Sequence, residues 1–417
     1  MKRTFVSVAV CALCIGVAAP ATVAATTPVF ESTVATAGPA VDDYTDVLPR
    51  WVDGQLDDAL VVVVPGTDDD RYPRVNGIVG GRDSAIVTYP ESFWPVISGR
   101  SGRLPFLAPT YDRSRDVAVA NTLTVMEALQ DADRVVVYTG YSQGSDALGN
   151  AAELAAARGL LGPDSTILLV SDPRGPWGVK SKLSDATLAS GLLRVIGIVN
   201  DGARDPAATG DAEVVHVIIQ GDPVVHAQWD WTRPVSSFVV DVAGFLAIHS
   251  DQGRYTYAHV ENLEHVRTLT SEDGNSTYEI YDTYHPLVLL NAMILGAVGV
   301  RVSEAQLATW DRVAEAFYPT QEITAANADP KARVVEAPLS APAVVPESAR
   351  GSAPDPVVVA DEPVAAQTSE TDPSPADTVP DETVPEATEL AAEQADPVSV
   401  DEPVVEPETV PVDEAAA

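Results

Sequence analysis

The chain has 417 residues and a formal net charge of −36 at pH 7, from 61 acidic and 25 basic side chains. Binding to nucleic-acid phosphates needs clustered Lys and Arg, so this acidic composition without a basic cluster excludes a nucleic-acid partner. Histidines and acids do not recur at metal-ligand spacing, so the sequence implies no metal and no cofactor.

The N-terminal segment predicts a secretory signal peptide over residues 1–25. Lys2 and Arg3 precede an apolar run from Phe5 to Ala19, and small residues follow up to Ala25. The run is too short to span a bilayer comfortably, and no later run of eighteen apolar residues follows, so we expect no transmembrane segment. Cleavage near Ala25 predicts a mature chain that is secreted or associated with the cell envelope. Both cysteines lie within this signal, so the mature chain would form no disulfide.

Residues 26–318 are predicted to fold as one α/β domain. Short apolar runs alternate with helical patterns, which favours a doubly wound, mainly parallel sheet. The predicted strands are Ala59 to Val64, Ser84 to Val87, Val135 to Tyr138, Thr166 to Val170 and Val214 to Ile219. The predicted helices are Asp112 to Ala132, Ser145 to Arg158 and Arg301 to Phe317. Catalytic groups are expected in the loops at the carboxyl ends of these strands.

Ser142 is the candidate nucleophile. Gly140, Ser142 and Gly144 form a G-x-S-x-G motif between an apolar strand and an Ala-rich helix. This is the context of a nucleophile elbow, so the sheet is expected to be of the α/β-hydrolase type. The backbone N–H of Gln143, at the start of that helix, would stabilise negative charge on a carbonyl oxygen. A second donor is expected from Gly66 or Thr67, after the first strand.

A serine nucleophile needs a histidine base that is oriented by a carboxylate. Asp222 and Asp172 both follow predicted strands, and Asp222 is preferred because the acid is generally carried a strand further from the elbow. Asp172 is interpreted as a turn residue. Among the six histidines the residue pattern leaves His249 and His285 as candidates. Four tryptophans are candidates to line an acyl pocket, although core packing explains them equally well: Trp94, Trp177, Trp229 and Trp231.

Residues 319–417 are predicted to form a disordered acidic tail. This segment contains 22 Asp and Glu against 3 Lys and Arg, and it is rich in Pro, Val, Ala and Thr. Such a composition cannot bury enough apolar surface to offset the entropy lost on ordering. We interpret the tail as a solvated spacer.

The stretch from about Leu60 to Leu289 resembles the PE-PPE domain, a serine hydrolase domain of mycobacteria and related actinobacteria that is similar to cutinases. The resemblance rests on Gly66-Thr67 after the first strand, Gly-Tyr-Ser-Gln-Gly around Ser142, Gly221-Asp222-Pro223, the small-residue pattern that leads to His249, and the Pro-Leu run after His285. It implies Ser142 as nucleophile, Asp222 as acid and His249, rather than His285, as base.

The resemblance also implies an activity on acyl esters. The sequence therefore predicts an exported serine ester hydrolase whose substrate is an acyl ester or an acylated lipid or sugar. The alternatives are a cell-envelope acyltransferase that uses the same triad and a non-catalytic surface binding protein on the same fold. A peptidase is a third possibility, because the same triad also cleaves amides.

Overall fold

The computed structural model describes residues 30–33, 44–69, 73–183, 194, 197–250 and 253–337. The predicted signal peptide and residues 338–417 lie outside these ranges. The described strands form one sheet in the order β1-β3-β2-β4-β5-β6-β8-β7-β9. Six strands are parallel: β2 Leu60–Val64, β3 Asp83–Val87, β4 Val136–Tyr141, β5 Ser165–Val170, β6 Glu213–Ile219 and β8 Ser276–Asp282. Three strands are antiparallel to their neighbours: β1 Phe30–Thr33, β7 Glu264–Ser271 and β9 Val334–Glu336.

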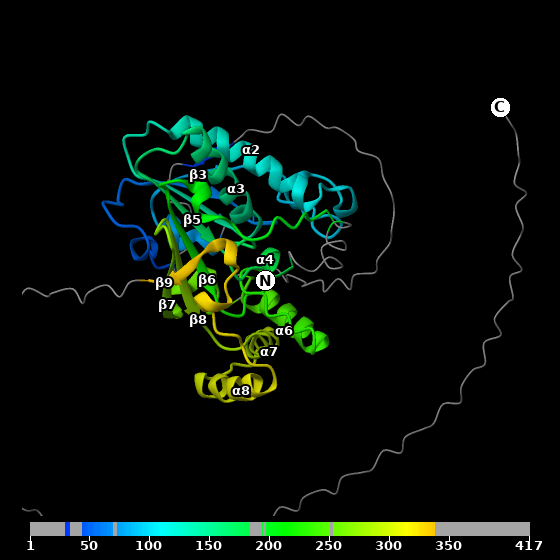
Figure 1. Cartoon of the computed structure of the whole chain (residues 1–417). Helices are drawn as coiled ribbons and strands as arrows, with labels where there is room; N and C mark the ends of the chain where they lie inside the picture. The colour runs from blue at the N-terminus through cyan, green and yellow to red at the C-terminus, as the bar shows by residue number, and fades with distance from the viewer. Residues whose placement is uncertain are drawn as a thin grey trace, which may run out of the picture. The chain divides into compact units, whose positions relative to one another are not determined.

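Helices cover both faces of the sheet (Figure 1). The α-helices in the described part are α1 Asn76–Val79, α2 Tyr111–Leu129, α3 Gln143–Arg158, α4 Val179–Leu183, α6 Pro234–Ala247, α7 Pro286–Ala297 and α8 Glu304–Phe317. The 3-10 helices are η1 Leu48–Arg50, η2 Pro73–Val75, η3 Gly99–Ser101, η4 Pro105–Leu107, η5 Pro206–Thr209, η6 Tyr257–Asn262, η7 Ala325–Asn327 and η8 Pro330–Ala332. No helix in the described ranges has the length and apolarity needed to cross a bilayer.

The central strands are apolar along their whole length because both of their faces are covered. In β2, for example, Val61 and Val63 belong to the core on the η1 and η6 side, whereas Val62 and Val64 belong to the core under α2 and α3. All five β2 residues are buried. The α/β class and the mainly parallel sheet predicted from the sequence are thus confirmed, and the predicted strands and helices agree with the structure to within a few residues.

The predicted end of the folded domain at residue 318 is wrong. The chain continues in ordered form to residue 337, where Val334–Glu336 pairs with β7 as an antiparallel strand. Ile323 and Ala332 are buried on the way. Composition averaged over residues 319–417 concealed this short apolar segment beside a long acidic one. Strands β1, β7, β8 and β9 have no counterpart among the strands predicted from apolar runs.

Candidate active site

Ser142 lies in a strained turn between β4 and α3. Its φ of 54° and ψ of −116° are unusual for a residue with a side chain, and such strain concentrates at functional sites. The two flanking glycines make the turn possible. A Cβ on Gly144 would lie 2.1 Å from the carbonyl oxygen of Val64, and one on Gly140 would lie 2.7 Å from that of Gly144. The sharp strand-to-helix turn that the sequence predicts at Ser142 is therefore present.

Ser142, His249 and Asp222 form one hydrogen-bonded row. The Oγ of Ser142 lies 3.0 Å from the Nε2 of His249. The Nδ1 of His249 lies 3.1 Å from each carboxylate oxygen of Asp222. With a proton on Nδ1, His249 donates to the carboxylate and its Nε2 accepts the serine O–H. The structure thus brings together the three residues selected from the sequence, although they are up to 107 positions apart.

Asp222 is fully buried and is held by three further donors. The hydroxyl of Ser171 donates to Oδ2 at 2.5 Å, and the hydroxyl of Tyr257 donates to the same oxygen at 2.9 Å. The backbone N–H of Val224 donates to Oδ1 at 3.0 Å. Burial by itself would raise the pKa of Asp222, but His249 and these hydrogen bonds outweigh it, so the pKa is lowered. The carboxylate is therefore ionised at neutral pH.

The imidazole of His249 is held by aromatic neighbours. It follows the C-terminal end of α6, and its ring stacks on Tyr141 and on Phe245, each at a centroid distance of 5.0 Å. The hydroxyl of Tyr141 also donates to the carbonyl oxygen of His249. Tyr141 immediately precedes Ser142, so one residue of β4 adjoins the serine and holds the imidazole.

The structure discriminates between the two candidates for the second oxyanion donor. The backbone N–H of Gly66 already donates to Asp69 at 3.2 Å. Within the described ranges, the backbone N–H groups of Thr67 and Gln143 have no acceptor. The Oγ of Thr67 donates to the side-chain Oε1 of Gln143 at 3.3 Å, which places both residues at one locus. Thr67 and Gln143 are therefore the better pair to receive a negatively charged oxygen.

The buried side chain of Gln143 connects this locus to its surroundings. Its Nε2 donates to the carbonyl oxygens of Ser92 and Tyr111, at 3.2 and 3.1 Å. The amide therefore ties the elbow to the segment after β3 and to the start of α2. The motif predicts only a backbone role for Gln143, because nothing in it shows where the side chain points.

The other sequence candidates have structural partners. Asp172 binds the guanidinium of Arg204, with Oδ2 at 2.6 Å from Nε. His285 caps α7, because its Nδ1 accepts the N–H of Leu287 at 3.1 Å. Its Nε2 lies 2.9 Å from the carbonyl oxygen of Tyr318. Both residues are thus occupied away from Ser142.

Two of the four tryptophans differ widely in exposure, which bears on their role in an acyl pocket. Trp177 is buried against Tyr278 and hydrogen-bonds to Asn327, so it belongs to the core and not to an acyl pocket. Trp231 is exposed. Within the described residues, no group of three His, Cys, Asp or Glu side chains is arranged to hold a metal ion.

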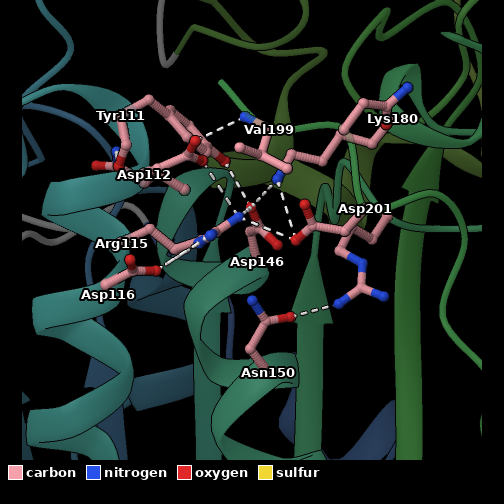
Figure 2. A network of polar contacts seen from close by, with 12 residues as sticks. Tyr111, Asp112, Arg115, Asp116, Asp146, Asn150, Lys180, Val199 and Asp201 are labelled. Carbon is pink, nitrogen blue, oxygen red and sulfur yellow. Dashed lines mark hydrogen bonds and ion pairs between the residues drawn. The ribbon is translucent and has the colours of Figure 1, made fainter. Parts of the chain in front are cut away.

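A buried charged network, which the sequence did not indicate, supports the start of α3. Its centre is Asp146, in the first turn of the helix, whose backbone N–H donates to the carbonyl oxygen of Ser142 at 3.0 Å. Figure 2 shows Lys180 and Arg115 directed at this carboxylate, at 2.7 and 3.6 Å. Arg204 lies 3.5 Å from its other oxygen. Burial would raise the pKa of Asp146, but these cations lower it well below its usual value.

Comparisons with known proteins place few limits on the function. No protein-family model matches the chain, and no curated protein shows a significant sequence match. Solved structures with similar folds include an esterase/lipase from an uncultured bacterium, at 14% identity over 63% of this chain and 76% of that one, with a TM-score of 0.28. They also include a type II thioesterase from the borrelidin biosynthetic cluster, at 16% identity over 60% and 92% of the two chains, with a TM-score of 0.28. A third is the catalytic core of the acetyl xylan esterase from Trichoderma reesei, at 17% identity over 46% and 95%, with a TM-score of 0.27. These scores are too low to assign an activity or a substrate to the chain.

Proposed function

We propose that the chain is an exported serine hydrolase that cleaves acyl esters. The observation that carries the proposal is the hydrogen-bonded row from Ser142 through His249 to Asp222, beside the N-terminus of α3. The resemblance to the PE-PPE domain and the signal-like N-terminal segment support the choice of ester chemistry and of a location outside the cytoplasm. The substrate class is an acyl ester, free or as part of an acylated lipid or sugar.

The geometry accounts for each step of ester cleavage. His249 Nε2 takes the proton of Ser142 as Oγ attacks the ester carbonyl carbon, and the charge that develops on the carbonyl oxygen is stabilised by the N–H groups of Gln143 and Thr67. The ionised Asp222 stabilises the imidazolium that forms. The imidazolium then returns its proton to the departing alkoxide, which leaves an acyl group on Ser142. Water, activated by His249, attacks this acyl group and releases the acid.

Turnover of p-nitrophenyl esters of increasing chain length, in the wild type and in Ser142→Ala, tests the proposal. Ser145→Ala is a matched control, because the hydroxyl of Ser145 is buried in the same helix and has no partner within the described residues. We expect turnover in the wild type and in Ser145→Ala and none in Ser142→Ala. Equal activity of all three proteins would contradict the proposal. If the folded wild-type protein shows no turnover, the result would favour a binding protein. If an added alcohol accepts the acyl group in place of water, the result would favour an acyltransferase.

A further inference from the structure

Helix α6 has its large apolar side chains on the outside. The face that packs inward carries mostly small residues: Ser237, Val240, Ala243, Gly244 and Ala247. The exposed face carries Val235, Phe238, Val239, Val242, Phe245 and Leu246. These six positions follow the three- and four-residue spacing of one side of a helix. Val235 is 75% exposed and Phe238 is 60% exposed.

The small residues on the inner face explain how α6 is held. The helix packs against α7, and a Cβ on Gly244 would lie 2.1 Å from the carbonyl oxygen of Gly221. The contact is therefore close, and it anchors the helix next to the turn that carries Asp222. The outer residues take no part in this contact, so the core does not account for their size.

The exposed face of α6 is continuous with the candidate active site. Phe245 belongs to this face, is 49% exposed and stacks on the ring of His249. A second set of exposed apolar side chains lies at the same edge of the sheet, where the carboxyl ends of the parallel strands meet. Leu104, Phe106 and Leu107 are exposed in and beside η4, in the connection that leaves the carboxyl end of β3. Ser142 follows the carboxyl end of β4, which runs in the same direction as β3 because both strands are parallel to β2.

The chemistry of the exposed face favours an uncharged lipid surface as its occupant. The only charged residue of α6, Asp241, is half-buried, and burial raises its pKa to about 6. Trp231, just before the helix, is 66% exposed, and tryptophan favours the boundary between lipid and water. A second copy of a chain with net charge −36 would be repelled, and so would an anionic membrane.

We propose that α6 docks the protein on a neutral or zwitterionic lipid surface. The substrate is then an ester whose acyl chain resides in that surface and reaches Ser142 past Phe245. An apolar helical face buried in the boundary of a bilayer supplies the binding free energy. This inference rests on the proposed ester hydrolysis for its substrate, whereas the docking itself requires no catalysis.

Flotation of the mature chain, residues 26–417, with phosphatidylcholine vesicles tests the docking. The test variant is Val235→Ser combined with Phe238→Ser, and the control is Val117→Ser combined with Leu154→Ser, which removes two exposed apolar side chains from α2 and α3. We expect wild type and control to float with the vesicles and the α6 variant to lose at least about tenfold in partitioning. Thermal unfolding checks that all three proteins are folded.

Three results would overturn the inference. They are a wild type that does not float, an α6 variant that floats like the wild type, and a wild-type dimer in light scattering that the α6 variant abolishes. The proposed ester hydrolysis is tested independently of the docking, because hydrolysis of a soluble p-nitrophenyl ester is measured without vesicles. A wild type that floats but hydrolyses no ester would keep the docking surface and refute the hydrolase.

Discussion

Asp172 and Asp222 follow neighbouring parallel strands, and each is followed by a proline. Each forms the same local turn, in which Oδ1 accepts the backbone N–H two residues further on: Arg174 for Asp172 and Val224 for Asp222. The two residues differ in what their Oδ2 atoms bind. The Oδ2 of Asp172 binds the permanently charged Arg204. The Oδ2 of Asp222 binds His249, Ser171 and Tyr257.

The sheet register explains this difference. Val170, the last residue of β5, pairs with Val217, and β6 continues for two residues beyond that pair. Asp222 therefore lies further along the sheet than Asp172, where it meets His249 at the end of α6. The comparison shows that an Asp-Pro turn after a strand does not by itself determine which side chains the carboxylate binds. The length of the strand decides where the carboxylate lies, and its partners are the side chains that it meets there.

The largest expected effect comes from replacing each of these two aspartates by asparagine. Asp222→Asn cannot hold the Nδ1 proton of His249, so we expect kcat on a soluble ester to fall by about 10⁴-fold with little loss of stability. Asp172→Asn weakens a buried ion pair, so we expect a loss of about 3 kcal/mol in the free energy of unfolding. Its kcat should stay within about tenfold of wild type, since Asp172 does not contact the row. Urea denaturation and ester kinetics on both variants check these outcomes, and the reverse pattern would refute the assignment.

A third buried acid, Glu91, sharpens the comparison because its cation lies further away than that of Asp172. Its nearest ion-pair partner, Arg100, lies 3.7 Å away and is partly exposed. Burial raises the pKa of Glu91 to about 8, against the opposing effect of Arg100. The folded protein therefore keeps this proton at pH values where the unfolded chain has lost it. Stability then falls as pH rises from about 4.5 to 8.

Glu91→Gln removes this titration. Relative to wild type, the variant should gain up to about 3 kcal/mol in the free energy of unfolding between pH 5 and pH 8. Urea denaturation at a series of pH values measures the difference. A stability difference that does not change with pH would show that Glu91 is ionised in the folded protein.

The smallest expected effect concerns Ser171, whose hydroxyl donates to Asp222. Ser171→Ala removes a donor to the carboxylate and should lower kcat on a soluble ester by about tenfold. Ser171 has a φ of 54°, so Ser171→Gly relieves backbone strain while removing the same hydroxyl. An equal loss in both variants, together with a shifted acid limb of the pH–rate profile, identifies the hydroxyl as a positioning group. Wild-type kinetics in either variant would show that it is dispensable.

The sequence predicted those parts of the site that depend on local pattern. The glycines around Ser142 are required by close backbone contacts, so the elbow is visible in five residues. The residue pattern alone does not distinguish His249 from His285, because no local pattern shows which imidazole reaches the serine. Only the family resemblance selects His249. Ser171 and Tyr257 were missed, since their hydroxyls meet Asp222 across 51 and 35 positions.

The same distinction applies to the fold. Strands buried on both faces are evident as continuous apolar runs, which is why β2 and β6 were predicted correctly. β7 begins with three exposed residues, continues with half-buried and buried ones, and gives no such run. The outward-facing phenylalanines of α6 were also not identified, because an apolar helix does not show in its sequence which face the core will take.

Intact-mass labelling with a fluorophosphonate tests the central claim, that His249 and Asp222 activate Ser142. The account predicts one adduct on the wild type and none on Ser142→Ala. Labelling of Asp222→Asn should be slower than that of the wild type by several orders of magnitude, whereas Asp172→Asn should be labelled at nearly the wild-type rate. An adduct that persists in Ser142→Ala, or a folded wild type that takes up no label, would contradict it.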